Sequence, residues 1–221
     1  MSNHVKILDT HSLTHDVNRI STEKPDGYSF KPGQATEIAI NKAGYRDEKR
    51  PFTFTCLSSD DRLEFTIKSY HDHDGVTHKI DSLTAGDEFI IDDAWGAIEY
   101  KGKGTFIAGG AGVTPFIAIL RHLEAKGELE GNRLIFSNKT EKDVIMRDEF
   151  HEMLGEDFIS TLTQEEAEGH ESGRIDADFL EKHVDDFSQH FYVCGPDEMV
   201  EDINEHLKEL GAEGDSLVFE E

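Results

Sequence analysis

The segment that decides the fold of this chain is residues 104–120, which read GTFIAGGAGVTPFIAIL. The apolar run 105–108 is typical of a buried strand, the glycines after it predict a turn, and 116–120 begins a helix. Pro115 falls in the first turn of that helix, where its missing N–H has no cost. Glycines let a backbone approach a diphosphate, and a helix start offers free N–H groups. The segment predicts a strand, a phosphate-binding turn and a helix.

The rest of the second half alternates strands and helices. Strands are expected at 104–108, 133–137, 158–162, 190–193 and 217–219. Helices are expected at 115–126, 145–154, 176–183 and 197–210, with an acidic loop over 164–173. This alternation predicts a parallel sheet with helices on both faces.

The first half is predicted to be β structure. Short alternating runs at 35–40, 63–68 and 88–91 are separated by turn signals, and a short helix is expected from Thr77 to Leu83. Strands at this spacing favour a small antiparallel barrel or sandwich. The change of rhythm near residue 101 divides the chain into two predicted domains, 1–101 and 102–221.

Composition limits the class of protein. The chain has 221 residues, of which 36% are hydrophobic and 31% charged. No apolar run approaches the roughly 18 residues of a spanning helix, and the first residues lack the apolar region of a signal peptide, so a cytoplasmic location is expected. Two cysteines, Cys56 and Cys194, cannot form a disulfide framework or a four-thiolate cluster. Any redox centre is therefore an organic cofactor or belongs to a partner.

The net charge of −25 is unevenly spread. Residues 1–101 hold 12 Lys and Arg against 18 Asp and Glu, whereas residues 102–221 hold 10 against 29. Such a chain is not expected to bind nucleic acid through its phosphates. The acidity is typical of a solvated surface, and it would also steer a basic partner.

The tetrad RPFT at 50–53 is a candidate binding strand. The planar fork of Arg50 suits a phosphate, Phe52 can pack against a flat ring, and the Thr53 hydroxyl can hydrogen-bond a ring nitrogen. The alternative is an ordinary edge strand with a surface arginine.

A second candidate segment runs from Ile67 to Thr77. Its end, Gly75-Val76-Thr77, can place backbone N–H groups and a hydroxyl at a helix start, where a diphosphate binds well. The alternative is a hairpin turn followed by an N-cap threonine. The run HDHD at 71–74 is better explained by a solvated turn than by a metal site, so no metal is expected.

Cys194-Gly195-Pro196 stands where a predicted parallel strand ends and a helix begins. Ligands of such sheets bind outside the carboxyl ends of the strands. Cys194 can touch a bound nicotinamide there, or it can be a buried small residue that ends a strand. No base is placed beside it in the sequence, so covalent catalysis is not expected.

The number, order and spacing of these segments resemble the ferredoxin–NADP reductase superfamily, and cytochrome b5 reductases and bacterial flavodoxin reductases in particular. The resemblance covers nearly the whole chain and implies an FAD-binding barrel followed by a nucleotide-binding α/β domain. The tetrad at 50–53 matches Arg-x-Tyr-Ser/Thr, with Phe52 in place of tyrosine. Residues 110–115 match Gly-x-Gly-x-Thr-Pro, and 194–196 match the Cys-Gly-Pro beside the nicotinamide. Residues 30–34 and 138–143 also resemble family segments.

The resemblance implies a set of site residues. The implied FAD contacts are Arg50, Pro51, Phe52, Thr53, Ile67, Lys68, Tyr70, Gly75, Val76, Thr77 and Phe219. The implied NAD(P) contacts are Gly110, Ala111, Gly112, Val113, Thr114, Pro115, Thr163, Cys194, Gly195 and Pro196, and the implied catalytic residues are Thr53 and Cys194. Phe219 either covers the flavin or belongs to the core of the last strand. Phe52 can stack but cannot hydrogen-bond as tyrosine does.

The resemblance further implies an FAD-dependent oxidoreductase that takes hydride from NAD(P)H and passes electrons to a separate protein, such as a flavodoxin, ferredoxin, cytochrome or oxygenase component. NADP-selective relatives place a serine and an arginine where Thr163-Gln164 stands here, so NADH is expected rather than NADPH. The alternatives are a flavin or quinone reductase and a non-catalytic binding subunit. FMN is also open, although residues 68–77 suit a dinucleotide better.

Overall fold

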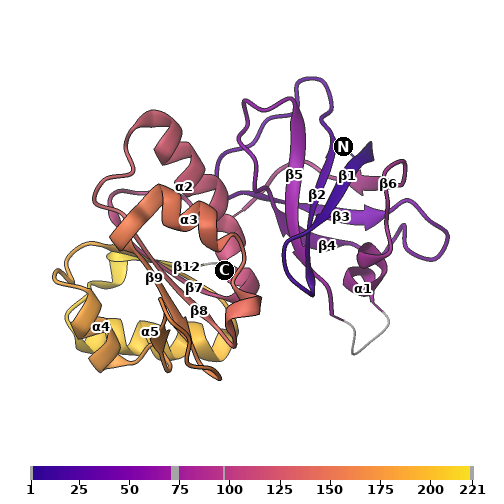
Figure 1. The fold of residues 1–221 in the computed structure, drawn as a ribbon. Coiled ribbons are helices and arrows are strands. Elements are labelled where there is room, and N and C mark those ends of the chain that lie inside the picture. The colour runs from indigo at the N-terminus through magenta and orange to yellow at the C-terminus, as the bar shows by residue number, and fades with distance from the viewer. Residues whose placement is uncertain (1, 71–74, 97, 220–221) are drawn as a thin grey trace. The chain divides into compact units, whose positions relative to one another are not determined.

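The computed structural model describes residues 2–70, 75–96 and 98–219, which form two compact units (Figure 1). The first unit holds Met1–Ala97 and Thr114–His122, and the second holds Ile98–Val113 and Leu123–Glu221. Residues 114–122 thus group with the first unit although they follow the predicted boundary at residue 101. That boundary stays a prediction.

The described strands of the first unit form an antiparallel sheet in the order β4-β3-β6-β1-β2-β5. The strands are β1 (Asn3–Ser12), β2 (Val17–Glu23), β3 (Ala35–Ile40), β4 (Arg50–Thr53), β5 (Arg62–Lys68) and β6 (Glu88–Ile91). An antiparallel bridge between Phe54 and Phe65 joins the chain after β4 to β5, so the two edges of the sheet meet. The predicted antiparallel barrel is confirmed.

Aromatic side chains fill the barrel. The Phe54 ring stacks on Phe30 with centroids 4.1 Å apart and lies tilted against Phe65 at 5.2 Å. Each large ring removes about 150–250 Å² from water, which gives a six-strand barrel its core. Helix α1 (Val76–Asp81) adds Val76 and Ile80 to this core, and it begins one residue earlier and ends two earlier than predicted.

The hairpin of β1 and β2 has no counterpart among the predicted strands. Only Val5 and Ile7 of β1 are buried, so the alternation of buried and exposed residues covers just a short part of the strand. The register then shifts between Ile7 and Asp9, which leaves Leu8 47% exposed. A bulge of this kind interrupts the period-2 pattern from which a strand is read.

The described strands of the second unit form a parallel sheet in the order β10-β9-β8-β7-β11-β12. The strands are β7 (Gly104–Gly109), β8 (Arg133–Asn138), β9 (Phe158–Leu162), β10 (Glu171–Ser172), β11 (His190–Cys194) and β12 (Leu217–Phe219). The predicted parallel sheet is confirmed. The segment 164–173, predicted to be a loop, contains the short strand β10, because Glu171 and Ser172 pair with the end of β9.

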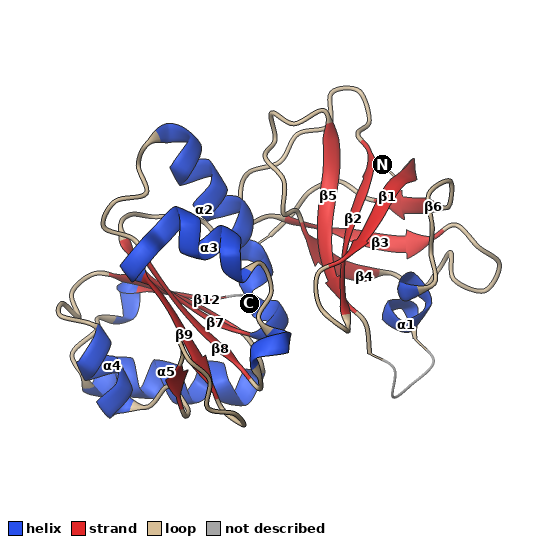
Figure 2. Ribbon diagram, in the orientation of Figure 1, coloured by secondary structure: helices blue, strands red, loops and turns tan. Residues whose placement is uncertain are grey.

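Helices cover both faces of this sheet (Figure 2). On one face α3 (Arg147–Leu154) sets the Phe150 ring edge-on to Phe136 at 6.1 Å, and on the other α4 (Ala177–His183) and α5 (Asp197–Glu209) bury Phe179 and Leu207. Helix α3 begins two residues later than predicted, because Met146 has a left-handed φ of 53°. The short 3-10 turns are η1 (Gly110–Val113), η2 (Glu141–Asp143), η3 (Gly155–Asp157) and η4 (Gly214–Ser216).

The order of strands reverses beside β7. The chain runs from β7 to β8 and β9 on one side, and then returns to place β11 on the other side. Ligands of open parallel sheets bind at the carboxyl ends of the strands at such a reversal. Helix α2 (Thr114–Lys126) follows the turn at this point. Among the described residues, no helix is both long and apolar enough to cross a membrane.

Candidate functional site

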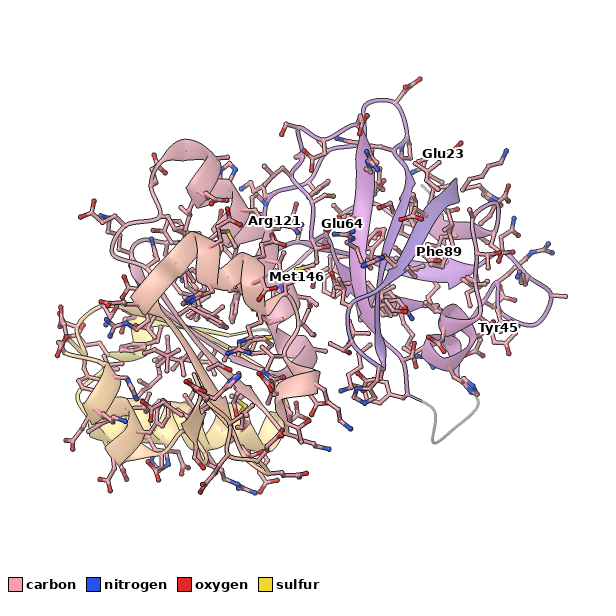
Figure 3. The ribbon with its side chains drawn as sticks, viewed as in Figure 1. Glu23, Tyr45, Glu64, Phe89, Arg121 and Met146 are labelled. Atoms are coloured by element: carbon pink, nitrogen blue, oxygen red, sulfur yellow. The ribbon has the colours of Figure 1, made fainter. Side chains whose placement is uncertain are left out.

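The barrel carries a pocket that joins two of the predicted binding segments. It has a volume of about 500 Å³ and brings Arg50 beside Gly75 and Thr77. Its wall is completed by Gly44, Tyr45, Glu48 and Val76. Tyr45 is labelled in Figure 3 near α1. Residues 25 positions apart in sequence therefore share one cavity, as a single ligand would require.

Arg50 presents its guanidinium to solvent at the edge of this pocket. The side chain is 52% exposed, its Nη1 donates to the Lys49 carbonyl at 2.7 Å, and its Nη2 lies 3.7 Å from a Glu48 carboxylate oxygen. Exposed pairs at such a distance contribute little stability. The guanidinium can therefore turn to a phosphate, which a planar fork binds through two parallel hydrogen bonds.

The residues of β4 become more buried along the strand. Pro51 is exposed, Phe52 is half-buried against the barrel core, and Thr53 pairs with Ala35 of β3. Thr77 is the second residue of α1, whereas Gly75 occupies the N-cap position. The alternative of an N-cap threonine at Thr77 is therefore wrong.

The second barrel segment divides between the core and the surface. Ile67 and Val76 are 1% and 3% exposed and belong to the core, so their side chains face away from solvent. Tyr70 is 46% exposed, which is unusual for so large a ring. The run 71–74, weighed above as a metal site, lies outside the described residues. In the described ranges, no group of three or more His, Cys, Asp or Glu could hold a metal ion.

Lys68, the last residue of β5, forms an ion pair with Asp16. Its Nζ lies 2.9 Å from Asp16 Oδ2, and both side chains are largely buried. Burial raises the pKa of Asp16, but the hydrogen bonds from Lys68 and Thr14 outweigh burial and hold that pKa below its ordinary value. Lys68 is thus fixed in place by a carboxylate that stays ionised.

The glycines of the β7–α2 turn have different surroundings. Gly110 has a φ of +51°, and a Cβ there would meet nothing within 4 Å. A Cβ on Gly112 would lie 2.4 Å from the Cys194 carbonyl oxygen, and one on Gly109 would lie 2.4 Å from Met199 Sδ. Gly110 therefore faces open space, while Gly109 and Gly112 let this turn pack closely against the turn after β11.

The turn after β11 consists of the predicted residues Cys194, Gly195 and Pro196. Cys194 is 8% exposed and ends the strand, and Pro196 is the N-cap residue of α5. A Cβ on Gly195 would lie 3.1 Å from the Gly109 nitrogen. The predicted position of these residues at the end of a parallel strand is confirmed, and it brings them against the glycine turn.

Asn138 was not among the predicted site residues. It ends β8 at the same edge of the sheet, is 6% exposed, and has no hydrogen-bond partner for either its Nδ2 or its Oδ1 within the described residues. A buried amide without partners costs about 1–3 kcal/mol, so a ligand or water that hydrogen-bonds Asn138 would remove this cost. A polar residue that ends an apolar strand was the signal that could have identified it.

Thr163 lies beside Asn138. Its backbone N–H donates to the Asn138 carbonyl at 2.9 Å, and the Gln164 N–H donates to the Lys139 carbonyl at 2.9 Å. The segments after β8 and β9 are therefore held together at the carboxyl edge. This edge thus combines Gly110, which faces open space, the Asn138 amide, which lacks a partner among the described residues, and the hydrogen-bonded backbone at Thr163. These features fit a bound nucleotide.

The acidic loop carries its carboxylates at this edge. The Glu165 carboxylate accepts the Glu141 N–H at 2.9 Å. The Arg147 guanidinium pairs with Glu141 Oε1 at 2.5 Å, and the same oxygen lies 3.5 Å from Nε2 of His170, whose side chain is fully buried. Arg147, whose guanidinium lies close to Gly169 of this loop, is already matched by a carboxylate.

The two predicted sets of residues divide between the units. The residues predicted to bind FAD lie in the first unit, except Phe219, which ends β12 and whose side chain lies outside the described part. The residues predicted to bind NAD(P) lie in the second unit, except Thr114 and Pro115, which belong to the first. All these roles stay predictions.

Family models match both halves of the chain. An FAD-binding domain matches residues 2–92, and an oxidoreductase NAD-binding domain matches residues 106–205. The chain is 28% identical over 228 residues to the reductase component of propane 2-monooxygenase from Rhodococcus jostii, covering 94% of this chain and 60% of that protein. It is 26% identical over 225 residues to NADH-cytochrome b5 reductase 2 from Mycosarcoma maydis, covering 91% and 63%. The chain thus spans about 60% of the length of these relatives.

Solved structures share the fold at low sequence identity. A ferredoxin NADP+ reductase from Neisseria gonorrhoeae with bound FAD and NADP matches with a TM-score of 0.86 and 21% identity, over 99% of this chain and 97% of that one. The FAD/NAD-binding domain of a nitric oxide dioxygenase from Vibrio cholerae matches with a TM-score of 0.87 and 18% identity, over 98% and 96%.

Proposed function

Because this chain belongs to the ferredoxin–NADP reductase superfamily, with an FAD-binding domain followed by an oxidoreductase NAD-binding domain, we propose that it is an NAD(P)H-dependent flavoprotein reductase. The observation that carries the proposal is that each unit of the chain has a candidate cofactor site, first in the barrel and then in the parallel sheet. One is the barrel pocket that unites Arg50 with Thr77, and the other is the open Gly110 turn at the carboxyl edge of the parallel sheet.

We propose that the barrel holds FAD. Arg50 would bind the diphosphate through its exposed guanidinium, and the Thr77 hydroxyl and the N–H groups at the start of α1 would complete that contact. Phe52 would pack against the flavin ring system, and Thr53 would hydrogen-bond one of its nitrogens. The exposed ring of Tyr70 would cover an aromatic part of the cofactor.

We propose that the nucleotide lies on the Gly110–Pro115 turn. Gly110 leaves room for the diphosphate, and the Asn138 amide would find a partner in the bound nucleotide. Cys194 and Gly195 would form one wall beside the nicotinamide. The bound cofactors would supply the redox chemistry, which is hydride transfer from the nicotinamide to the flavin and electrons for the acceptor. Cys194 and Gly195 would orient the nicotinamide, and Phe52 and Thr53 would orient the flavin.

The preferred nucleotide is NADH. A 2′-phosphate needs a cation, and the Thr163-Gln164 position offers none. The neighbouring Arg147 pairs with Glu141, and the Glu165 carboxylate lies in the same loop. A dianionic phosphate would meet like charges there, whereas a ribose 2′-hydroxyl would meet hydrogen-bond acceptors.

The acceptor is a separate redox protein. Relatives of this chain are named as reductase components of monooxygenase and dioxygenase systems. We therefore propose a small redox protein or an oxygenase component as acceptor. The cytoplasmic location expected from the sequence stays a prediction.

An anaerobic titration of the FAD-loaded protein tests this function. We expect NADH to bleach the flavin band at a near-equal amount, and NADPH to do so only at much higher concentration. Bleaching by NADPH alone would overturn the nucleotide preference and keep the enzyme. A protein that takes up no FAD, or whose flavin neither nucleotide reduces, would overturn the function and favour a binding subunit. Rapid turnover with free flavin and none with any redox protein would favour a flavin reductase.

A further inference from the structure

An arginine of α2 is bound to the barrel by two hydrogen bonds that the proposed function does not use. Arg121 Nη1 donates to the Thr55 carbonyl at 2.7 Å and to Glu64 Oε1 at 2.7 Å. The Arg121 and Glu64 side chains are only 19% and 15% exposed. Figure 3 shows the two side chains, from α2 and β5, next to each other. All three residues belong to the first compact unit.

Glu64 is the centre of this contact. The same Oε1 accepts the Thr55 hydroxyl at 3.0 Å, and the other carboxylate oxygen lies 3.9 Å from Arg19 Nε. One nitrogen, Nη1, carries two N–H groups and donates to both the Glu64 carboxylate and the Thr55 carbonyl, and the planar guanidinium fixes the directions of these donors, whereas the donors of a lysine rotate freely. Charge-assisted hydrogen bonds at this distance are the strong class.

The contact lies on the face of α2 that begins at the glycine turn. Seven residues separate Thr114 from Arg121, which is close to two helical turns, so the two share a face about 10 Å apart along the axis. The intervening residues 115–120 are all buried. Thr114 and Pro115, the last residues of the proposed nucleotide turn, therefore begin a packed helix that Arg121 holds about two turns further along.

The same contact lies close to the proposed flavin strand. Thr55 follows Thr53 by two residues, and its N–H donates to the Glu64 carbonyl at 2.9 Å. One guanidinium thus holds both the chain just beyond Thr53 and the helix that starts at Thr114. Thr53 is one of the residues proposed to contact the flavin, and Thr114 is one of the residues proposed to bind the nucleotide.

We propose that Arg121 and Glu64 are a positioning pair, which fixes the start of α2 against the end of β4 and so sets the geometry for flavin reduction. This inference rests on the proposed function. Neither residue touches a cofactor in this scheme, and both act through Thr55 and Thr114. Misplacement of reacting groups by about 1 Å can slow a reaction about a hundredfold, even when the mutation is remote.

The test compares Arg121→Gln, Glu64→Gln and the double variant with the wild-type holoenzyme. Arg133→Gln is the matched control, because Arg133 also bridges a carboxylate, Asp157 at 3.0 Å, and a carbonyl, that of His183, but does so at the start of β8. Three quantities are measured: the FAD content, the rate of flavin bleaching at saturating NADH, and the hydrogen exchange of the backbone amides 114–120, apart from Pro115, which has no N–H.

We expect both single variants to retain FAD, to bleach about a hundredfold more slowly, and to exchange the amides 114–120 faster. The NADH concentration for half-maximal rate should change little, since no nucleotide contact is removed. The double variant should be no slower than either single one, because the two residues act as one unit. Arg133→Gln should lose thermal stability and keep the rate and the exchange.

Bleaching rates within about twofold of wild type in both single variants would overturn the proposal, as would an equal loss in Arg133→Gln. If Arg121→Gln does not fold, Arg121→Lys gives the test, since it keeps the charge but lacks the planar guanidinium that fixes the donors, and an unchanged rate in it would also overturn the proposal. A wild-type protein that neither nucleotide bleaches would refute the proposed function itself, which is a distinguishable result.

Discussion

The two glycines of the nucleotide turn allow a paired test, because the structure gives them opposite roles. In Gly112→Ala the new Cβ would lie 2.4 Å from the Cys194 oxygen and 2.6 Å from the Cys194 carbon, both of them backbone atoms. In Gly110→Ala the new Cβ would meet nothing within 4 Å. The first change therefore affects packing, and the second affects the space left for a ligand.

The magnitude follows from these distances. Carbon atoms pack at about 3.5–4.0 Å, so the turns after β7 and β11 must separate by roughly 1 Å in Gly112→Ala. Overpacking of this kind costs about 1–3 kcal/mol, and contact with two backbone atoms places it at the upper end. Alanine also stabilises the protein by about 0.4–1 kcal/mol, because it restricts the unfolded chain, so the free energy of unfolding should fall by about 2 kcal/mol in total. Gly110→Ala should cost only about 1 kcal/mol, because alanine is less stable than glycine in the left-handed backbone conformation.

Calorimetry and nucleotide titration separate the two effects. We expect Gly112→Ala to lower the Tm by roughly 4–8 °C, since about 1 kcal/mol shifts a protein of this size by 2–4 °C. Gly110→Ala should lower the Tm less and weaken NADH binding more. A Tm for Gly112→Ala within about 1 °C of wild type would refute the packing argument. Unchanged NADH binding in Gly110→Ala would refute the argument that its open space holds the nucleotide.

Two further predictions concern the barrel. Arg50→Ala should lower the FAD content of the purified protein, measured as the ratio of flavin to protein absorbance. Arg62→Ala, which removes an arginine that pairs with the exposed Asp61, should leave this ratio unchanged. Undiminished flavin in Arg50→Ala would contradict the assigned role. The folded pKa of Asp16 is lowered, so its contribution to stability is present above the unfolded value near 4 and is lost as pH falls through the folded pKa. Asp16→Asn should therefore be less stable than wild type at pH 6 and converge with it toward pH 3, and parallel Tm profiles would disprove this.

The architecture was predictable because its signals are local. The parallel sheet follows from strands of three to five residues that alternate with helices, and the run 104–120 places the turn between the first strand and its helix. The β1–β2 hairpin was missed because only Val5 and Ile7 of β1 face the core. The start of α3 was misplaced because a left-handed methionine is a rare conformation that composition does not reveal.

The site was only partly predictable, because its remaining features depend on residues distant in sequence. Asn138 could have been found as a polar end to an apolar strand, but its lack of partners is visible only once β7 and β9 flank it. Arg121 resembles any solvated helix arginine until Glu64, 57 residues earlier, lies beside it. Spacing in sequence indicates which elements exist, and packing determines which side chains they bring together.

The glycine turn shows why a motif and its mechanism must be separated. Sequence reasoning assigns all its glycines to phosphate approach, yet Gly109 faces Met199 of α5 and Gly112 faces Cys194 at the end of β11, some 80–90 residues later. Because these two glycines have no side chains, the ends of β7 and β11 can pack directly against each other in the absence of a ligand. Only Gly110 faces open space. A phosphate-binding turn binds more tightly when it already has its bound shape, because no free energy is then needed to order it. Here the packing of Gly109 and Gly112 holds the turn in that shape, and Gly110 leaves the space for the ligand.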